Sequence, residues 1–239
     1  MIKAATLAAV LALAGPPAMQ GPYGQGADIY WLWRVPHPHA VVVFEHGLYP
    51  SELYPGNHEP WIDHLAREGN DVIYPRYEDA PGRGPALIHS LTAIHAALVR
   101  LGKPHVPLVV VGYSRGGRLA VELSAAAWRI GARPAAIMSI FPSTLNRQAE
   151  EVVNLTNLPK TARIVLLAGQ EDSPAGVLEL LKRLRKDNFP ADHVQAVVVH
   201  SKGSFHADHL SALQTTPEAK RQFWDRLDRL IALARRDYR

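Results

Sequence analysis

Residues 108–117 read LVVVGYSRGG, an apolar run that ends in the pattern G-x-S-x-G, and a helical apolar pattern follows over residues 119–127. A strand that turns this tightly into a helix forces Ser114 into a strained backbone conformation, and Gly112 and Gly116 remove side chains that would clash there. The turn exposes the serine hydroxyl beside a helix N-terminus, where developing negative charge is favoured. The stretch therefore predicts a nucleophilic serine, with an incidental serine in a glycine-rich turn as the alternative.

Short apolar or β-branched runs recur on both sides of this stretch, separated by helix-length amphipathic segments. The runs start about 30 residues apart, which is the size of a strand–helix–strand unit. Most are apolar on consecutive residues, as expected for strands buried on both faces of a parallel sheet. We therefore expect an α/β fold with an open, doubly wound, mostly parallel sheet, whose strands are residues 41–44, 72–74, 108–111, 135–140, 163–167 and 196–199.

One further strand is expected over residues 28–33, which read DIYWLW. The link over residues 35–39 is too short for a crossover helix, so this strand is predicted to form an antiparallel hairpin with residues 41–44. In an open parallel sheet, ligands bind outside the carboxyl ends of the strands. Chemistry is therefore expected in the segments that directly follow each strand.

The composition of the chain narrows the functional classes. Its 239 residues carry 26 Lys and Arg, 22 Asp and Glu and no cysteine, and 47% are hydrophobic. A dilute net charge of +4 argues against nucleic-acid binding, and the lack of cysteine excludes disulfides, a cysteine nucleophile and thiolate metal sites. No apolar run reaches the ~18 residues of a membrane-spanning helix. We also expect no metal, because the histidine pairs at 37/39 and 206/209 fit a proline loop and a catalytic base better than a ligand set.

The first residues resemble a leader. Lys3 precedes an apolar stretch over residues 4–14, and Ala12-Leu13-Ala14 is an A-x-A cleavage pattern, with Ala18 as a second candidate site. A packed N-terminal helix is the alternative, but the stretch shows no amphipathic stripe. We expect a signal peptide within residues 1–20 and a single catalytic domain over residues 21–239. The protein is then periplasmic or extracellular, with a cytoplasmic location as the alternative.

A serine nucleophile needs a base and an acid that orients the base. Asp172 follows the run at 163–167 and is the expected acid, although it could instead cap the next helix, and Glu171 is the second choice. Three histidines follow the run at 196–199. His209 is the expected base because apolar residues directly after it anchor the loop end, His206 is the alternate base, and His200 is assigned to the strand.

An oxyanion hole requires two N–H groups aimed at the developing negative charge. One is expected from the backbone of Arg115, next after the serine. The other is expected from the loop after residues 41–44, where we assign Leu48 N–H, with Tyr49 as the alternative. His46 is interpreted as a structural histidine that braces this loop.

On these residues the chain resembles the α/β-hydrolase superfamily over residues 28–235, and in particular its compact bacterial lipase and dienelactone-hydrolase-like branch, which includes PET hydrolases. The resemblance rests on HG at 46–47, WIDHLAREGNDVIYPRY at 61–77, GYSRGG at 112–117, GQED at 169–172 and ADHL at 207–210. It implies Ser114 as nucleophile, Asp172 as acid and His209 as base. Two departures stand out: only one strand is expected before Val41, where many relatives have two, and Arg115 replaces the Met or Gln of several lipases.

The 22 residues from Phe141 to Ala162 leave no room for a cap domain, which predicts an open site. Tyr49 and Phe141 are expected to line the substrate pocket, and Tyr54 and Trp61 could do so too. The alternative is that these side chains belong to the core, which fits Trp61 better because it lies within a helical pattern. The sequence thus predicts a cofactor-free serine esterase that acts on small esters, lipids or polyesters. The alternatives are a thioesterase or peptidase with the same triad, or an inactive binding protein. Oligomeric state is not decided.

Overall fold

The computed structural model describes residues 17–80, 84–145 and 152–238. One eight-stranded sheet runs through it, in the order β1-β2-β4-β3-β5-β6-β7-β8. The strands from β3 onward are parallel to one another, and β1 and β2 are antiparallel to their neighbours. The strands are β1 (Met19–Tyr23), β2 (Tyr30–Trp33), β3 (Val41–Glu45), β4 (Asp71–Pro75), β5 (Leu108–Tyr113), β6 (Pro134–Ile140), β7 (Arg163–Gly169) and β8 (Val194–Val199). The predicted α/β fold with a doubly wound, mostly parallel sheet is confirmed.

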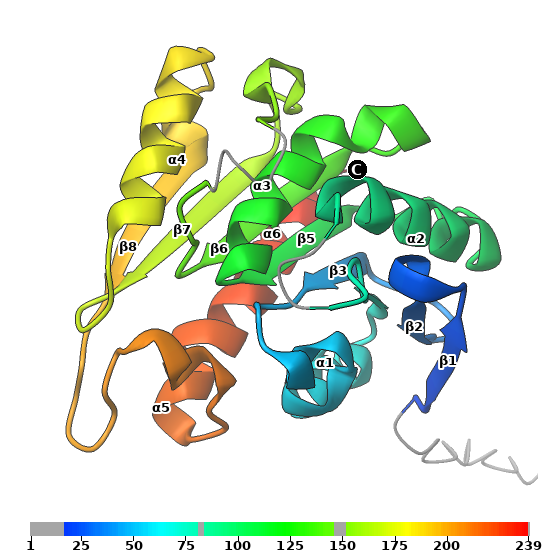
Figure 1. Cartoon of the computed structure of the whole chain (residues 1–239), viewed down its shortest axis with the longest axis horizontal. Helices are drawn as coiled ribbons and strands as arrows, with labels where there is room; N and C mark the ends of the chain where they lie inside the picture. Colours follow the sequence, from blue (N-terminus) through cyan, green and yellow to red (C-terminus); the bar gives the residue numbers. More distant parts are fainter. Residues whose placement is uncertain (1–16, 81–83, 146–151, 239) are drawn as a thin grey trace, which may run out of the picture.

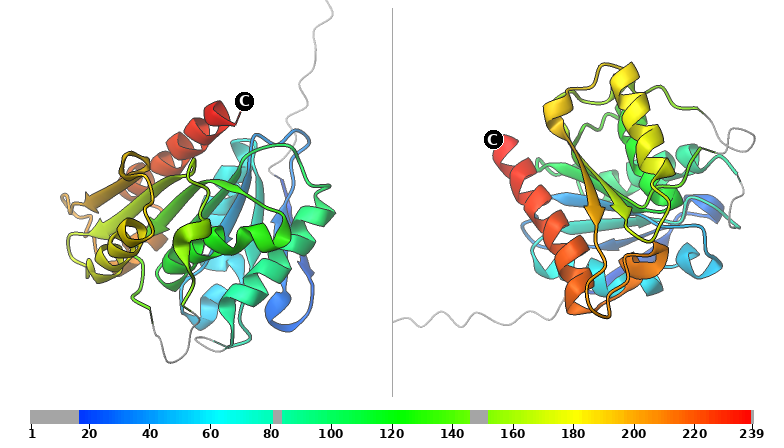
Figure 2. Two further views of the ribbon diagram at one scale, coloured as in Figure 1. Left: turned by 90° about the horizontal axis from the view of Figure 1, so that it is seen from above. Right: turned by 90° about the vertical axis from the view of Figure 1, so that its left-hand side faces the viewer.

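Helices cover both faces of this sheet (Figure 1). They are α1 (Glu59–Arg67), α2 (Ala86–Arg100), α3 (Arg115–Ala126), α4 (Ala175–Lys186), α5 (Pro217–Ala219) and α6 (Asp225–Asp237). Figure 2 shows α6 on one side of the sheet and α2, α3 and α4 on the other. Successive residues of a strand pack into two hydrophobic cores, one on each face of the sheet. Val43 lies in the core that includes α2, α3 and α4, and Val42 and Phe44 lie in the core that includes α1 and α6. This double burial explains why the strands read as continuous apolar runs.

The predicted hairpin between β2 and β3 is wrong. β2 is antiparallel, but its partners are β1 and β4, and Trp31 lies opposite Tyr74 of β4. The link between β2 and β3 passes the beginning of β4, where Val35 N–H donates to Asp71 Oδ1 at 2.8 Å and His39 N–H donates to Gly69 O at 2.7 Å. Seven residues can span roughly 23 Å, whereas two strand spacings need only about 10 Å. A short link therefore excludes a helix but does not require adjacent strands.

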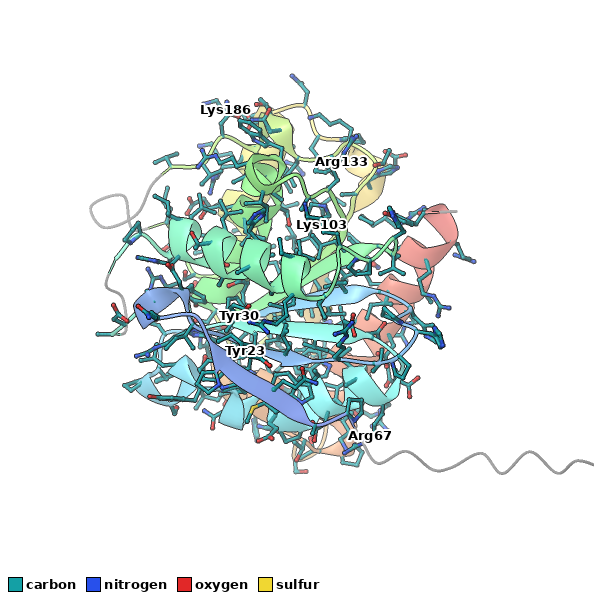
Figure 3. The ribbon with its side chains drawn as sticks, turned by 90° about the vertical axis from the view of Figure 1, so that its right-hand side faces the viewer. Tyr23, Tyr30, Arg67, Lys103, Arg133 and Lys186 are labelled. Carbon is teal, nitrogen blue, oxygen red and sulfur yellow. The ribbon has the colours of Figure 1, made fainter. Side chains whose placement is uncertain are left out.

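Two strands precede Val41, so the expectation of a single one is wrong. β1 pairs with β2, and Gln20 lies opposite Leu32. The sequence MQGPY lacks the apolar alternation of a strand. At this edge Tyr23 and Tyr30 lie side by side with ring centroids 5.5 Å apart (Figure 3). The Arg100 guanidinium of α2 lies 3.9 Å from the centre of the Tyr23 ring.

The predicted leader falls mostly on residues 1–16, which lie outside the described residues. Cleavage after Ala14 or Ala18 would leave β1 intact, whereas cleavage after Gln20 would remove its first two residues. The leader and its cleavage site stay predictions. In the described part of the β6–β7 connection, the structure contains one short 3₁₀ turn, Leu155–Asn157. The expected minimal cap agrees with this part of the connection.

Candidate active site

Ser114 occupies the turn between β5 and α3 with φ 57° and ψ −119°, a conformation that few non-glycine residues adopt. Glycine is needed on both sides of it. A Cβ on Gly112 would collide with the backbone carbonyl of Gly116, and a Cβ on Gly116 would collide with the backbone carbonyls of Glu45 and His46. The end of β3 therefore packs directly against the turn, whereas the sequence indicated only that the glycines relieve clashes within the turn itself.

Three side chains from three loops form one hydrogen-bonded chain. The Nε2 atom of His209 lies 2.9 Å from Ser114 Oγ, and its Nδ1 atom lies 2.7 Å from Asp172 Oδ2. Asp172 follows β7, and His209 begins the 3₁₀ turn His209–Leu213 after β8. The Tyr113 hydroxyl donates to the His209 carbonyl at 2.8 Å, which ties the histidine loop to the strand that carries the serine. The structure thus brings Ser114, Asp172 and His209 together in the order that proton transfer needs.

The second-choice acid and base pair with each other. His206 is 64% exposed, and its Nδ1 atom lies 3.2 Å from both carboxylate oxygens of Glu171. The Ser201 hydroxyl also donates to Glu171, and these contacts hold the pKa of Glu171 below its usual value. His200 contacts Gln170, with 3.1 Å between Nδ1 and Oε1. None of these contacts joins the Ser114–His209–Asp172 chain.

His46 is fully buried beneath the loop that follows β3. Its two ring nitrogens lie 2.6 Å from the Gly47 carbonyl and 2.7 Å from the Arg76 carbonyl, and the ring stacks on Tyr77 with centroids 4.1 Å apart. Burial outweighs these carbonyl acceptors and lowers the pKa of His46 to about 4. A neutral ring has one N–H, so one of the two carbonyls accepts a hydrogen bond from it and the other only lies against the ring. A buried ring packed between two loops agrees with the structural role expected from the sequence.

The two expected oxyanion donors come from different segments of the chain. Arg115 is the first residue of α3, and its buried side chain forms an ion pair with Glu78. Leu48 and Tyr49 are exposed in the loop after β3. Phe141 is buried, with its ring 6.3 Å from the His209 ring and 5.6 Å from the Phe223 ring, so it backs the histidine from the core. A role of Tyr49 and Phe141 in substrate binding stays a prediction.

Sequence reasoning missed Glu52, which is fully buried in the same loop and accepts a hydrogen bond from Gly47 N–H. An acidic residue between Ser51 and Leu53 has the pattern of a solvated loop, so no local signal marks it.

Trp61 is buried and stacks on Trp224 with ring centroids 6.0 Å apart, as a core residue does, whereas Tyr54 is exposed. Among the described residues, no group of three His, Asp or Glu side chains could hold a metal ion.

A cavity of about 580 Å³ lies at the opposite edge of the sheet. It is lined by the first residues of β3, β5 and β6 and by Lys103 and Arg133, which Figure 3 shows on that side. Because Ser114, Asp172 and His209 follow the carboxyl ends of their strands, this cavity is separate from them. Lys103 directly follows the C-terminal end of α2, where positive charge is favoured for structural reasons.

A family model described as a thioesterase domain matches residues 61–235. The chain belongs to the thioesterase domain family. The match covers α1 through most of α6, and with them Ser114, Asp172 and His209. Comparison of this thioesterase domain with curated proteins gives no match.

Solved structures similar to this thioesterase domain show the same fold. Esterase B from Lactobacillus rhamnosis, inhibited by a tributyrin phosphonate, is 19% identical with a TM-score of 0.63, over 92% of this chain and 86% of that one. A fungal esterase from Rhizomucor miehei is 16% identical with a TM-score of 0.62, over 94% and 85%. Carboxyl esterase 2 from Tuber melanosporum is 16% identical with a TM-score of 0.61, over 88% and 80%. The domain is an α/β-hydrolase, and no helix within its described residues is long and apolar enough to cross a bilayer.

Proposed function

We propose that this protein hydrolyses carboxylic esters through an acyl-enzyme on Ser114. The observation that carries the proposal is the continuous chain of hydrogen bonds from Ser114 through His209 to Asp172. A serine hydroxyl is a poor nucleophile unless a base removes its proton, and the base must present the correct nitrogen. The 2.9 Å and 2.7 Å contacts meet both requirements.

Each residue has one role in the proposed reaction. Ser114 Oγ attacks the acyl carbon while His209 Nε2 takes its proton, and His209 then returns that proton to the leaving alcohol. Asp172 orients the imidazole and stabilises its positive charge. The N–H groups of Leu48 and Arg115 hold the tetrahedral oxyanion. Water, activated by the same histidine, then releases the acid and restores Ser114.

The test is the replacement of the nucleophile. We expect Ser114→Ala to lower turnover of p-nitrophenyl esters by at least about 10³-fold and to abolish labelling by a fluorophosphonate probe. The melting temperature should stay within about 2 °C, because the side chain is small and half-buried. Residual labelling of the variant, or full activity, would show that another residue is the nucleophile.

Thioester hydrolysis is the second candidate, and the thioesterase-domain match favours it. The same triad accepts both substrates, because a thiolate is a better leaving group than an alkoxide. Parallel kinetics on acyl-CoA thioesters and p-nitrophenyl esters of equal chain length distinguish the two. A kcat/KM at least about 100-fold higher on the thioester would make thioesters the natural class.

An apolar rim supports larger acyl substrates. Leu48, Tyr49 and Tyr54 are exposed on the loop after β3, and Leu210 is exposed directly after His209. Lipid or polyester chains are therefore the proposed substrates, and a panel of acyl chain lengths tests this. Export remains a proposal that the sequence of residues 1–14 alone supports.

A further inference from the structure

Glu52 is buried where a carboxylate is costly. It lies in the 3₁₀ turn Pro50–Leu53 between β3 and α1, and its side chain is completely shielded from solvent. Removing a carboxylate from water costs several kcal/mol unless hydrogen bonds compensate. A buried carboxylate does not contribute to solubility, so the role of Glu52 must be sought in its contacts.

The carboxylate of Glu52 connects the two ends of this loop. Its Oε2 accepts the N–H of Gly47 at the beginning of the loop and lies 3.6 Å from His58 Nε2 at the beginning of α1. The backbone of Glu52 is held as well, since its N–H donates to Tyr49 O at 2.9 Å and its carbonyl accepts the Tyr74 hydroxyl at 2.6 Å. The loop therefore closes around one buried acid.

Gly47 lies between this acid and the strand that carries the nucleophile. A Cβ on Gly47 would come within 2.5 Å of Glu52 Oε2 and within 3.0 Å of the Tyr113 ring, and Tyr113 directly precedes Ser114. The next amide, Leu48 N–H, donates to no group among the described residues. The Gly47 amide is thus committed to Glu52, while the Leu48 amide remains available for a ligand.

From these contacts we infer that Glu52 is a positioning residue for the oxyanion hole, an inference that rests on the proposed function. It holds the His46–Gly47 peptide through the Gly47 N–H, while the His46 ring, with Nδ1 2.6 Å from the Gly47 carbonyl, holds the following peptide, whose N–H is the Leu48 donor. Donors that are held in place before the reaction stabilise the transition state without reorganisation. Glu52 acts through Gly47 and Leu48 and does not itself touch the substrate.

The test compares Glu52→Ala, which removes the acceptor, with Glu52→Gln, which retains one at the same reach. We expect Glu52→Ala to lower kcat on a p-nitrophenyl ester about 100-fold with KM changed less than about threefold. Glu52→Gln should recover most of that loss. Affinity for a trifluoromethyl ketone, which forms a tetrahedral adduct with the serine, should fall in the same proportion as kcat/KM across the series.

A matched control separates positioning from stability. Glu122 is an equally buried acid on α3 that pairs with Arg118 and Arg183. Glu122→Gln should lower the melting temperature while kcat stays within about twofold. Should Glu52→Ala not fold, Glu52→Asp withdraws the carboxylate by one methylene and tests the same contact.

Two results would overturn the inference, and neither resembles failure of the proposed function. One is unchanged kcat in a folded Glu52→Ala or Glu52→Asp variant that has only a lower melting temperature. The other is loss of kcat without a parallel loss of ketone affinity. Failure of the proposed function would already be seen in the wild-type protein, as an absence of Ser114-dependent fluorophosphonate labelling.

Discussion

At the scale of single residues, the backbone of Ser114 and the backbone of Phe141 behind His209 adopt unusual conformations. Ser114 has a positive φ of 57°, and Phe141, which backs His209, also has a positive φ of 47°. Such conformations cost roughly 1–3 kcal/mol each for non-glycine residues and persist only where the surrounding structure enforces them. The Ser114 N–H donates to Ile140 O and the Phe141 N–H donates to Leu167 O, both at 2.9 Å, so neighbouring strands hold both residues in place.

The two candidate bases should separate cleanly by mutation. We expect His209→Ala to lower the rate of Ser114 acylation by at least about 10³-fold, because no other ring nitrogen contacts Ser114 Oγ among the described residues. His206→Ala should stay within about threefold of the wild type, since its contacts are to Glu171 on the surface. The measurement is the burst of p-nitrophenol in stopped flow. A loss confined to His206→Ala would reverse the assignment.

At the scale of elements, the turn between β5 and α3 is tight because the backbones of β5, α3 and the end of β3 meet there with no side chains between them. Gly112 faces the carbonyl of Gly116, and Gly116 faces the last residue of β3 and the residue after it. At the beginning of the loop after β3, Gly47 likewise lies against the Tyr113 ring, directly before Ser114. The turn is therefore a junction of two strands and a helix, and its glycines allow the three backbones to pack in contact.

A methyl group at this junction should be costly. We expect Gly116→Ala to destabilise the protein by about 3 kcal/mol or more, because the obstructing atoms are backbone carbonyls that cannot turn away. Gly56→Ala is the control, since nothing lies within 4 Å of its added Cβ, and it should change stability by less than about 0.5 kcal/mol. Urea unfolding of both variants measures the difference; equal effects would contradict the packing described here.

At the scale of the whole molecule, the carboxyl edge of the sheet holds a set of fully buried acids: Glu45, Glu52 and Glu78. They belong to β3, to the loop after it and to the loop after β4, and Glu78 forms an ion pair with Arg115, the residue after Ser114. Burial raises the pKa of Glu45 to about 8, although the Ser90 hydroxyl, which donates to Oε1 at 2.6 Å, acts in the opposite direction. The stability of the edge that carries Ser114 is therefore expected to depend on pH.

The sign of this effect follows from proton binding. Glu45 holds its proton in the folded chain up to about pH 8, whereas the unfolded value is 4.5. Its contribution to stability is therefore complete below about pH 4.5 and is lost progressively as the pH rises to about 8. Glu45→Gln keeps an acceptor for Ser90 but cannot ionise. We expect the stability of this variant relative to wild type to increase between about pH 5 and about pH 9, on the order of 3 kcal/mol in total. If the difference in the free energy of unfolding between the variant and the wild type does not change with pH across this range, Glu45 is not protonated in the folded state.

The sequence alone was sufficient for features that depend on local rules. Continuous apolar runs indicated doubly buried strands, because such strands have no polar face. The glycines around Ser114 indicated a tight turn, and the placement of Asp172 and His209 after later strands located them at the carboxyl edge, because parallel strands end on the same side. Strand order was less accessible: β1 has no apolar pattern, and a short link did not show that β4 lies between β2 and β3.

The sequence by itself determined the α/β class and the placement of Ser114, Asp172 and His209 at the carboxyl edge of the sheet, because strand burial and turn geometry depend on neighbouring residues. Only the tertiary structure decided which histidine contacts Ser114, since His206 and His209 are three residues apart and differ in the direction in which the loop turns them. It alone revealed Glu52, because burial of a loop carboxylate depends on Gly47, His58 and Tyr74, which come from separate segments. Contacts between segments distant in sequence leave no periodic pattern, and the candidate oxyanion loop is held by contacts of that kind.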